Sequence, residues 1–260
     1  MPSVGRKSLN LWYVDHCTSV QISTRQDRQR WRHSQEIISI QSLNINFKMK
    51  DIAIFGAGGF GREIACLIKQ INNQEPTWNL VGFFDDNPAL LGTKNEYGEV
   101  LGGIDVLNQY NKELAITIAI GNPSVVRKVV GAITNDKIWF PNLVAPDVII
   151  MDEENFSMGR GNIICCKCWI SCNVRFGDFN ILNVGITVGH DAQLGNYNTL
   201  MPAVNISGEV VVGEENFFGV ASVVLQQKKI GYKTVIGGNS MIIKNTKDGR
   251  TYMGNPATAL

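Results

Sequence analysis

The sequence lacks a long apolar run and a strong net charge. No hydrophobic stretch approaches the roughly 20 residues that a membrane-spanning helix needs, so we expect no membrane insertion. The formal net charge is only +1 at pH 7, and we expect no nucleic-acid partner. With 44% hydrophobic residues, a chain of 260 residues can bury the cores of two ordinary soluble domains.

Histidine is scarce, and cysteine lacks the spacing of a known framework. Only three histidines occur, and two of them, His16 and His33, fall in the first 48 residues. Six cysteines are present, but no secretory signal precedes them, so we expect a cytoplasmic protein without a disulfide framework. The run 165–172 contains four cysteines without the two C-x-x-C pairs of a zinc ribbon, and we expect no metal.

Residues 1–48 differ from the rest of the chain. They show no sustained hydrophobic period and carry seven Lys or Arg against three Asp or Glu. A mitochondrial-type targeting segment is one interpretation of this basic composition. The interpretation that we favour is a disordered leader in front of a natural start at Met49.

A repeat dominates the second half of the chain. An apolar residue occurs at every sixth position from Met158 to Ile242, and a second period of eighteen lies on top of it. The period of eighteen is carried by two series of residues: Gly159, Gly177, Gly195, Gly213 and Gly231, and Asn162, Asn180, Asn198 and Asn216. Three hexads therefore make one structural turn.

Each hexad fits one short strand and one corner. The fourth residue after each apolar position is usually small, and two such residues can share one face of a strand. We expect the glycine that often follows the apolar residue to supply a positive φ at the corner. Three strands and three corners describe a triangular prism of parallel strands, whose handedness the period leaves open. We expect Lys228 to fall on an inward position, where its charge would be costly, and so we expect residues 225–229 to bulge.

Residues 50–132 show a different pattern. A short apolar strand at 52–55 leads into a glycine-rich loop and a helical run that ends near Ile71. Such a loop lets a phosphate approach backbone N–H groups at the start of a helix, where the helix dipole favours an anion. The candidate binding glycines are Gly56, Gly58, Gly59 and Gly61.

Two further strands complete this candidate pocket. The strand at 80–84 ends in Asp85 and Asp86, about where such folds place a ribose-binding acid. The strand at 115–120 runs into Asn122 and a second helix. Roughly 90 residues provide only half of a dinucleotide fold, which favours a mononucleotide over the cofactor of a dehydrogenase. The alternative is a small α/β domain whose glycines only make a turn.

His190 is the only histidine after the leader, and Asp191 follows it. In the hexad frame His190 lies on a corner and points out of the prism. An outward histidine on a rigid scaffold can act as a general base, and a neighbouring carboxylate can orient its ring. A surface histidine without a function is the alternative.

The sequence resembles a known family from Met49 to the C-terminus. The motifs that carry the resemblance are IFGAGGFGRE at 54–63, FFDD at 83–86, AIGN at 119–122, LNVGITVGHD at 182–191 and GNPA at 254–257. They resemble hexapeptide-repeat sugar acetyltransferases, a family that includes UDP-amino-sugar and perosamine N-acetyltransferases and sialic acid O-acetyltransferases. The resemblance implies a Rossmann-like nucleotide-sugar domain at 49–140 and a left-handed parallel β-helix at 141–260.

The same resemblance implies the functional residues and partners. It makes His190 and Asp191 the catalytic pair, and it places the nucleotide of the acceptor against the glycine loop and the two aspartates. It makes the amide of Gly208 the oxyanion donor. The positions that it assigns to the acetyl-CoA groove are Thr199, Val220 and Gly238. It also implies a homotrimer with acetyl-CoA bound between subunits.

We therefore predict acetyl transfer from acetyl-CoA to an amine or hydroxyl of a sugar that is nucleotide-linked. One alternative enzyme is a serine acetyltransferase-like O-acetyltransferase, which shares the repeat but not the glycine-loop domain. A non-enzyme alternative is a trimeric nucleotide-binding scaffold, and absence of acetyl-CoA binding would favour it.

Overall fold

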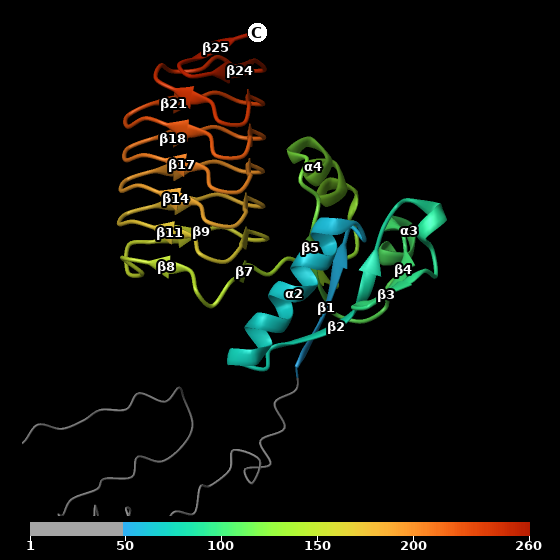
Figure 1. Cartoon of the computed structure of the whole chain (residues 1–260). Helices are drawn as coiled ribbons and strands as arrows, with labels where there is room; N and C mark the ends of the chain where they lie inside the picture. Colours follow the sequence, from blue (N-terminus) through green and yellow to red (C-terminus); the bar gives the residue numbers. More distant parts are fainter. Residues whose placement is uncertain (1–48) are drawn as a thin grey trace, which may run out of the picture. The chain divides into compact units, whose positions relative to one another are not determined.

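The computed structural model describes residues 49–260, which form an α/β domain followed by a β-helix (Figure 1). The predicted leader, with His16 and His33, lies outside the described residues. None of the helices between residues 49 and 260 combines the length and the apolar character needed to cross a membrane.

A mostly parallel sheet forms the centre of the α/β domain. Its strand order is β3-β4-β2-β1-β5-β6, and only β3 and β4 pair antiparallel. The strands are β1 (Lys50–Phe55), β2 (Trp78–Phe84), β3 (Lys94–Asn95), β4 (Gly98–Gly102), β5 (Leu114–Ile118) and β6 (Ile138–Trp139). Consecutive residues Ile52, Ala53 and Ile54 are all fully buried, because both faces of a parallel sheet are covered.

Three α-helices belong to this domain. Helix α2 (Gly59–Gln74) buries Ile64, Leu67 and Ile68, which its 3.6-residue period places on one face. Helix α4 (Pro123–Ala132) starts with proline, whose missing N–H costs nothing at that position. The remaining helical segments are α3 (Ile104–Asn108) and the 3-10 helix η2 (Pro88–Leu90).

The β-helix has three faces of short strands, which are parallel except for β25, the antiparallel partner of β24. Face 1 consists of β7 (Leu143–Val144), β10 (Ile163–Ile164), β13 (Ile181–Leu182), β16 (Thr199–Leu200), β19 (Phe217–Phe218), β22 (Val235–Ile236), β24 (Thr251–Gly254) and β25 (Ala257–Ala259). Face 2 consists of β8 (Ile149–Ile150), β11 (Trp169–Ile170), β14 (Thr187–Val188), β17 (Asn205–Ile206), β20 (Val223–Val224) and β23 (Met241–Ile242). Face 3 consists of β9 (Ser157–Met158), β12 (Arg175–Phe176), β15 (Gln193–Leu194), β18 (Val211–Val212) and β21 (Lys229–Ile230).

The observed coil length confirms the repeat. From β9 to β20, the residues of each strand pair with residues 18 positions away on the next coil, as Ile170 does with Val188. The second residue of each strand points inward, and from Ile164 to Ile242 these residues are at most 5% exposed. The fold class is therefore the predicted one, an α/β domain followed by a left-handed parallel β-helix.

A ladder of asparagines holds the corner between face 3 and face 1. The Oδ1 of Asn180 accepts from the backbone N and the Nδ2 of Asn198, both at 3.0 Å. The same pair of bonds joins Asn162 to Asn180 and Asn198 to Asn216. These asparagines are fully buried, so each rung satisfies a backbone donor that water cannot reach.

The corner glycines have a different role from the predicted one. The positive φ occurs two residues later, at residues such as Phe179 (φ 54°) and Glu215 (φ 57°). Gly195 and Gly213 instead allow the coils to approach, because a Cβ on either would lie 2.7 Å or 2.6 Å from a carbonyl oxygen of the next coil. The expectation of a positive φ at these glycines was wrong.

The expected bulge at residues 225–229 is absent. Strand β21 keeps its regular register with β18, pairing Val211 with Lys229. Lys228 is half-buried rather than enclosed. Strand β21 is the last strand of face 3, so the aliphatic part of Lys228 can pack on the coil while its ammonium group reaches solvent.

Residues of the α/β domain also contact the β-helix. Ile163 and Ile181, which point out of face 1, belong to the same buried cluster as Ile64 and Leu67 of α2. Arg127 of α4 forms an ion pair with Glu215, whose side chain is only 6% exposed. The two parts therefore share a packed contact along face 1.

Removing one rung of the asparagine ladder should destabilise the fold. Asn180→Ala leaves the buried backbone N–H of Asn198 without its acceptor, which we expect to cost about 2 kcal/mol of unfolding free energy. The melting temperature should fall by roughly 5 °C. Asn155→Ala is the control, because the amide of Asn155 is exposed and bonds only to Asp152. Equal melting temperatures for both variants would show that the ladder contributes no stability.

Candidate active site

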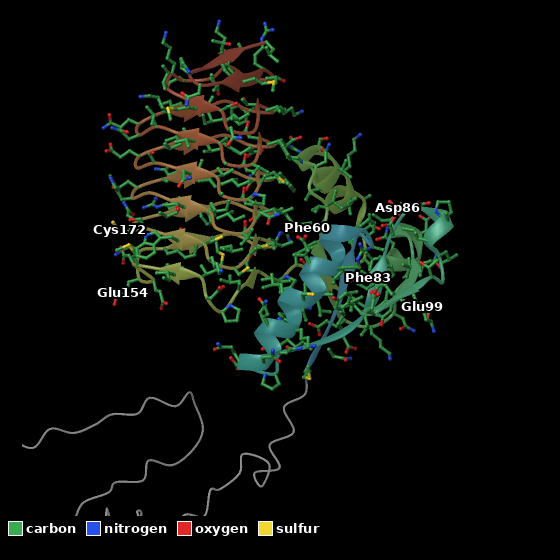
Figure 2. All side chains as sticks on the ribbon, in the orientation of Figure 1. Phe60, Phe83, Asp86, Glu99, Glu154 and Cys172 are labelled. Carbon is green, nitrogen blue, oxygen red and sulfur yellow. The ribbon has the colours of Figure 1, made fainter. Side chains whose placement is uncertain are left out.

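His190 lies at the corner between face 2 and face 3, after β14 and before β15. Its Nδ1 is 2.8 Å from Oδ2 of Asp191, so the predicted pair is in hydrogen-bond contact. Asp191 has the left-handed backbone (φ 58°) that recurs at these corners, and this turn brings two adjacent side chains together. Cys172, labelled in Figure 2, stands at the same corner one coil earlier.

The hydrogen bonds of Asp191 favour its ionised form. The contact with His190, followed by a 2.6 Å bond from Nδ2 of Asn173, lowers the pKa of the Asp191 carboxyl below its usual value. The stabilisation that these bonds give is present above the ordinary carboxyl pKa and is lost as the pH falls through the lowered one. At neutral pH the carboxylate can therefore orient the imidazole and stabilise its cation.

Gly208 lies directly against the His190 ring. A Cβ on Gly208 would be 2.5 Å from Nε2 of His190, so only glycine leaves room for the imidazole. Within residues 49–260, the N–H of Gly208 donates to no backbone carbonyl. The corner thus presents a ring nitrogen and a free backbone donor side by side, which are the groups that acyl transfer requires.

The glycine loop between β1 and α2 has two kinds of glycine. Gly56 (φ 110°) would place a Cβ 2.7 Å from the carbonyl oxygen of Ala119, and a Cβ on Gly61 would collide with the carbonyl oxygen of Gly56. Gly56 and Gly61 must therefore be glycine, because a side chain at either position would collide with a carbonyl oxygen. A Cβ on Gly58 would have no neighbour within 4 Å, and one on Gly59 would meet only the end of the Arg62 side chain. The backbone at 58–59 is therefore open to a ligand at the start of α2.

The predicted acidic and amide residues meet at the same sheet edge. Asp85 follows β2, and its Oδ2 accepts from the N–H of Ala57 in the glycine loop at 2.9 Å. Asp86 (Figure 2) accepts from the N–H of Ile104 at 2.8 Å. Asn122 caps α4 through Ser124 and follows β5. Strands β2, β1 and β5 are parallel neighbours, so their carboxyl ends lie at one edge of the sheet, the usual position of a ligand in such sheets.

The residues predicted for acetyl-CoA fall at three places. Gly208 adjoins His190. Val220 and Gly238 are neighbours at the corner between face 1 and face 2, where a Cβ on Gly238 would lie 3.3 Å from the carbonyl oxygen of Val220. Thr199 points out of face 1 and is 2% exposed, so the structure does not bring it together with the others.

Sequence reasoning missed two contacts. Asn173, which binds Asp191, lies 18 residues before it, so the coil period could have revealed this neighbour. Arg127 of α4 lies 5.6 Å from the ring centre of Tyr197 in addition to pairing with Glu215, and no pattern in the sequence marks this contact. A cleft of about 600 Å³ opens there, lined by Ser124, Arg127, Lys128, Gly131, Glu214, Glu215, Tyr232 and Lys233.

The cysteines at 165–172 differ in burial, and Cys168 is the buried one. No group of three or more His, Cys, Asp or Glu in the described part of the chain could hold a metal ion. Burial raises the pKa of the Cys165 thiol to about 12 and that of the Cys168 thiol to about 11. Both thiols are therefore protonated at neutral pH.

Gly208→Ala should damage catalysis more than folding. The added methyl group displaces the His190 ring and crowds the proposed oxyanion donor, so we expect kcat to fall by about 100-fold or more. Gly131→Ala in α4 is the control, because its Cβ would meet no atom within 4 Å. Steady-state kinetics and thermal melting of the two variants make the comparison. Unchanged turnover in Gly208→Ala would exclude this corner as the reaction site.

Comparison with known proteins gives matches to each part of the chain. Residues 51–133 match the family model of the PglD N-terminal domain, which spans the glycine loop, Asp85, Asp86 and Asn122. A curated relative, the redox-sensing transcriptional repressor Rex from Clostridium novyi (strain NT), is 40% identical over 85 residues. That match covers 33% of this chain and 37% of the repressor, so it extends over little more than a third of that relative.

Solved structures match over both parts. The acetyltransferase domain of PglB from Neisseria gonorrhoeae FA1090, in complex with acetyl coenzyme A, is 28% identical with a TM-score of 0.73, covering 82% of this chain and 100% of that one. WeeI from Acinetobacter baumannii AYE is 27% identical with a TM-score of 0.73 and the same coverage. PerB from Caulobacter crescentus, in complex with CoA and GDP-perosamine, is 25% identical with a TM-score of 0.68, covering 81% of this chain and 97% of that one.

These matches agree with the motifs and with the geometry of the His190 corner. The family model covers the nucleotide half, and the solved acetyltransferases cover the α/β domain and the β-helix together. The chain is thus similar to solved sugar acetyltransferases over both its α/β domain and its β-helix.

Proposed function

We propose that the protein transfers the acetyl group of acetyl-CoA to a sugar that is linked to a nucleotide, with an amine as the first choice of acceptor group and a hydroxyl as the second. The observation that carries this proposal is the contact of His190 with both Asp191 and Gly208. The choice of an amine is supported by the similar Caulobacter protein, which was solved with CoA and GDP-perosamine. The proposed substrates are cytoplasmic metabolites, which supports a cytoplasmic location.

His190 acts as the general base in this proposal. Its Nδ1–H donates to Asp191, so its Nε2 carries the free lone pair. As the acceptor nitrogen attacks the thioester carbon, Nε2 of His190 removes a proton from that nitrogen. The N–H of Gly208 donates to the oxyanion that forms on the carbonyl oxygen. When the C–S bond breaks, the imidazolium returns its proton to the leaving CoA thiolate, and an amide and free CoA result.

The α/β domain holds the nucleotide in this proposal. The open backbone at Gly58 and Gly59 meets a phosphate at the start of α2, where the N-cap has no side-chain hydrogen bond. Asp85 and Asp86 follow the neighbouring strand β2, and Asp85 contacts this loop through Ala57. Both carboxylates already bind backbone N–H groups, and each can still accept from a ribose hydroxyl through its remaining lone pairs.

A homotrimer would complete the site. His190 lies at the corner of faces 2 and 3, whereas the α/β domain packs on face 1 of the same chain. Val220 and Gly238 lie at the opposite edge of face 2 from His190. Face 2 and its edges expose apolar side chains, with Ile149 at 49%, Trp169 at 43% and Val220 at 48%. Such a surface usually marks an interface, and a neighbouring copy could bring its own nucleotide crevice to His190.

Replacing His190 tests the proposed reaction. Release of free CoA is measured with a panel of UDP-, GDP-, dTDP- and CMP-linked sugars that carry an amine or a hydroxyl. His190→Ala should lower kcat by about 100-fold to 10,000-fold, the usual contribution of a general base. Cys172→Ala, one coil away at the same corner, is the control and should retain full activity. Calorimetry should show unchanged acetyl-CoA binding in both.

Two results would contradict this proposal. Near-normal turnover in His190→Ala would remove the histidine from the mechanism. Failure of the unsubstituted protein to bind acetyl-CoA would favour the non-catalytic scaffold instead.

Replacing Gly58 separates the two substrate sites. A Cβ at this position meets no protein atom within 4 Å, so we expect Gly58→Val to fold normally while its side chain blocks the approach of phosphate. The KM for the nucleotide sugar should rise by about tenfold or more, because one charge-assisted contact is lost. Affinity for acetyl-CoA should not change. If only acetyl-CoA binding suffers, the two substrates have been assigned to the wrong parts of the chain.

Mixing two inactive variants extends this test to the assembly. Chains with Gly58→Val retain His190, and chains with His190→Ala retain the nucleotide crevice. Mixed oligomers should regain activity if one copy supplies the crevice and another the base. Light scattering should give about three times the chain mass of 28.7 kDa. A fully active monomer would exclude a shared site.

A further inference from the structure

Asn173 occupies the same corner position as Asp191, one coil earlier. Both residues have a left-handed backbone, with φ 54° and 58°, and they lie 18 residues apart. The Nδ2 of Asn173 donates to Oδ1 of Asp191 at 2.6 Å, while Oδ2 of Asp191 contacts Nδ1 of His190 at 2.8 Å. Each oxygen of the carboxylate therefore has one partner, and the carboxylate is held from two sides.

An exposed carboxylate needs such a second contact to stay in place. The side chain of Asp191 is 46% exposed, so water competes for both of its oxygens. A single bond to the His190 ring would leave both side chains free to rotate together. Asn173 belongs to the preceding coil, and the N–H of Asp191 also donates to that coil, to the carbonyl oxygen of Cys172 at 3.0 Å.

The chemical type of Asn173 suits this position. Its amide is a neutral donor, so it holds Oδ1 without cancelling the negative charge that the imidazolium needs. A lysine or arginine would compete with His190 for the carboxylate, and an aspartate would repel it. At the same corner of the adjoining coils, residues 171–175 and 207–211, the titratable side chains are Cys172, Arg175 and Glu209, and none of them bonds to Asp191.

We propose that Asn173 is a positioning residue for the acetyl transfer. By holding Oδ1, it aims Oδ2 of Asp191 at Nδ1 of His190, which keeps the proton on Nδ1 and leaves Nε2 free toward the acceptor. This inference rests on the proposed role of His190 as the base. Asn173 itself touches neither substrate.

Two substitutions test the role of Asn173 in the full-length protein. Asn173→Gly removes the donor without backbone strain, because glycine readily adopts φ 54°. Asn173→Asp keeps the shape but replaces the donor by a second carboxylate. Lys167→Gly is the matched control, since Lys167 is an exposed left-handed corner residue (φ 59°) away from the His190 corner.

The expected kinetic effect is intermediate. Asn173→Gly should lower kcat by between about tenfold and about 100-fold, less than removal of the base itself, with unchanged affinity for acetyl-CoA. Asn173→Asp should move the acid limb of the pH–rate profile to higher pH, because a second ionised carboxylate beside Asp191 adds negative charge that favours the protonated ring. Lys167→Gly should match the unsubstituted protein.

A second readout does not depend on activity. NMR of histidine labelled in the ring reports the His190 tautomer, and the His190→Ala spectrum assigns its signal among the three histidines. At a pH where the ring is neutral, Asn173→Gly should reduce the fraction protonated on Nδ1. A lower kcat with an unchanged tautomer, or no change in either, would overturn the proposal. A changed tautomer with unchanged kcat would support the positioning role of Asn173 but refute His190 as the base.

Discussion

The stacking of coils at an 18-residue spacing is the constraint on which this structure depends. Each coil contributes only two-residue strands, so few hydrogen bonds would remain if one coil slipped against the next. The buried ladder through Asn162, Asn180, Asn198 and Asn216 fixes the register, because each amide bonds to the equivalent residue of its neighbour. A shift of one residue would leave several buried donors and acceptors unpaired, which is far more costly than losing one exposed contact.

The same spacing builds the candidate active site. His190 and Gly208 are equivalent positions on consecutive coils, and so are Asn173 and Asp191. A residue on a flexible loop would have to be ordered each time a substrate binds, whereas these side chains stand on a scaffold whose corners are already fixed. The corner therefore supplies preorganisation, the property that makes a backbone donor effective toward a developing oxyanion.

Much of this arrangement could be predicted from the sequence, because periodicity reports which residues point inward. The hexads predicted the buried series and placed His190 outward at a corner. The period alone could not give the detailed role of the glycines, since close approach of coils and a positive φ both favour glycine and only coordinates separate them. The regular register around Lys228 was not predicted, because the sequence does not reveal that the following strand, β21, is the last strand of face 3. The pairing of Arg127 with Glu215 joins residues 88 positions apart outside the repeat, so no local pattern marks it.

The separation of the candidate groups around the prism has a consequence for catalysis. A prism with three faces exposes its corners in three directions, so a domain that packs on face 1 cannot also cover the corner between faces 2 and 3. In the proposed reaction, binding of the acceptor and removal of its proton therefore fall on different sides of one chain. Assembly of copies around a threefold axis would turn this separation into a requirement, because each reaction site would draw on two chains. Selection for activity would then act on the interface as strongly as on His190 itself, and the exposed apolar residues of face 2 would be as necessary to turnover as the base.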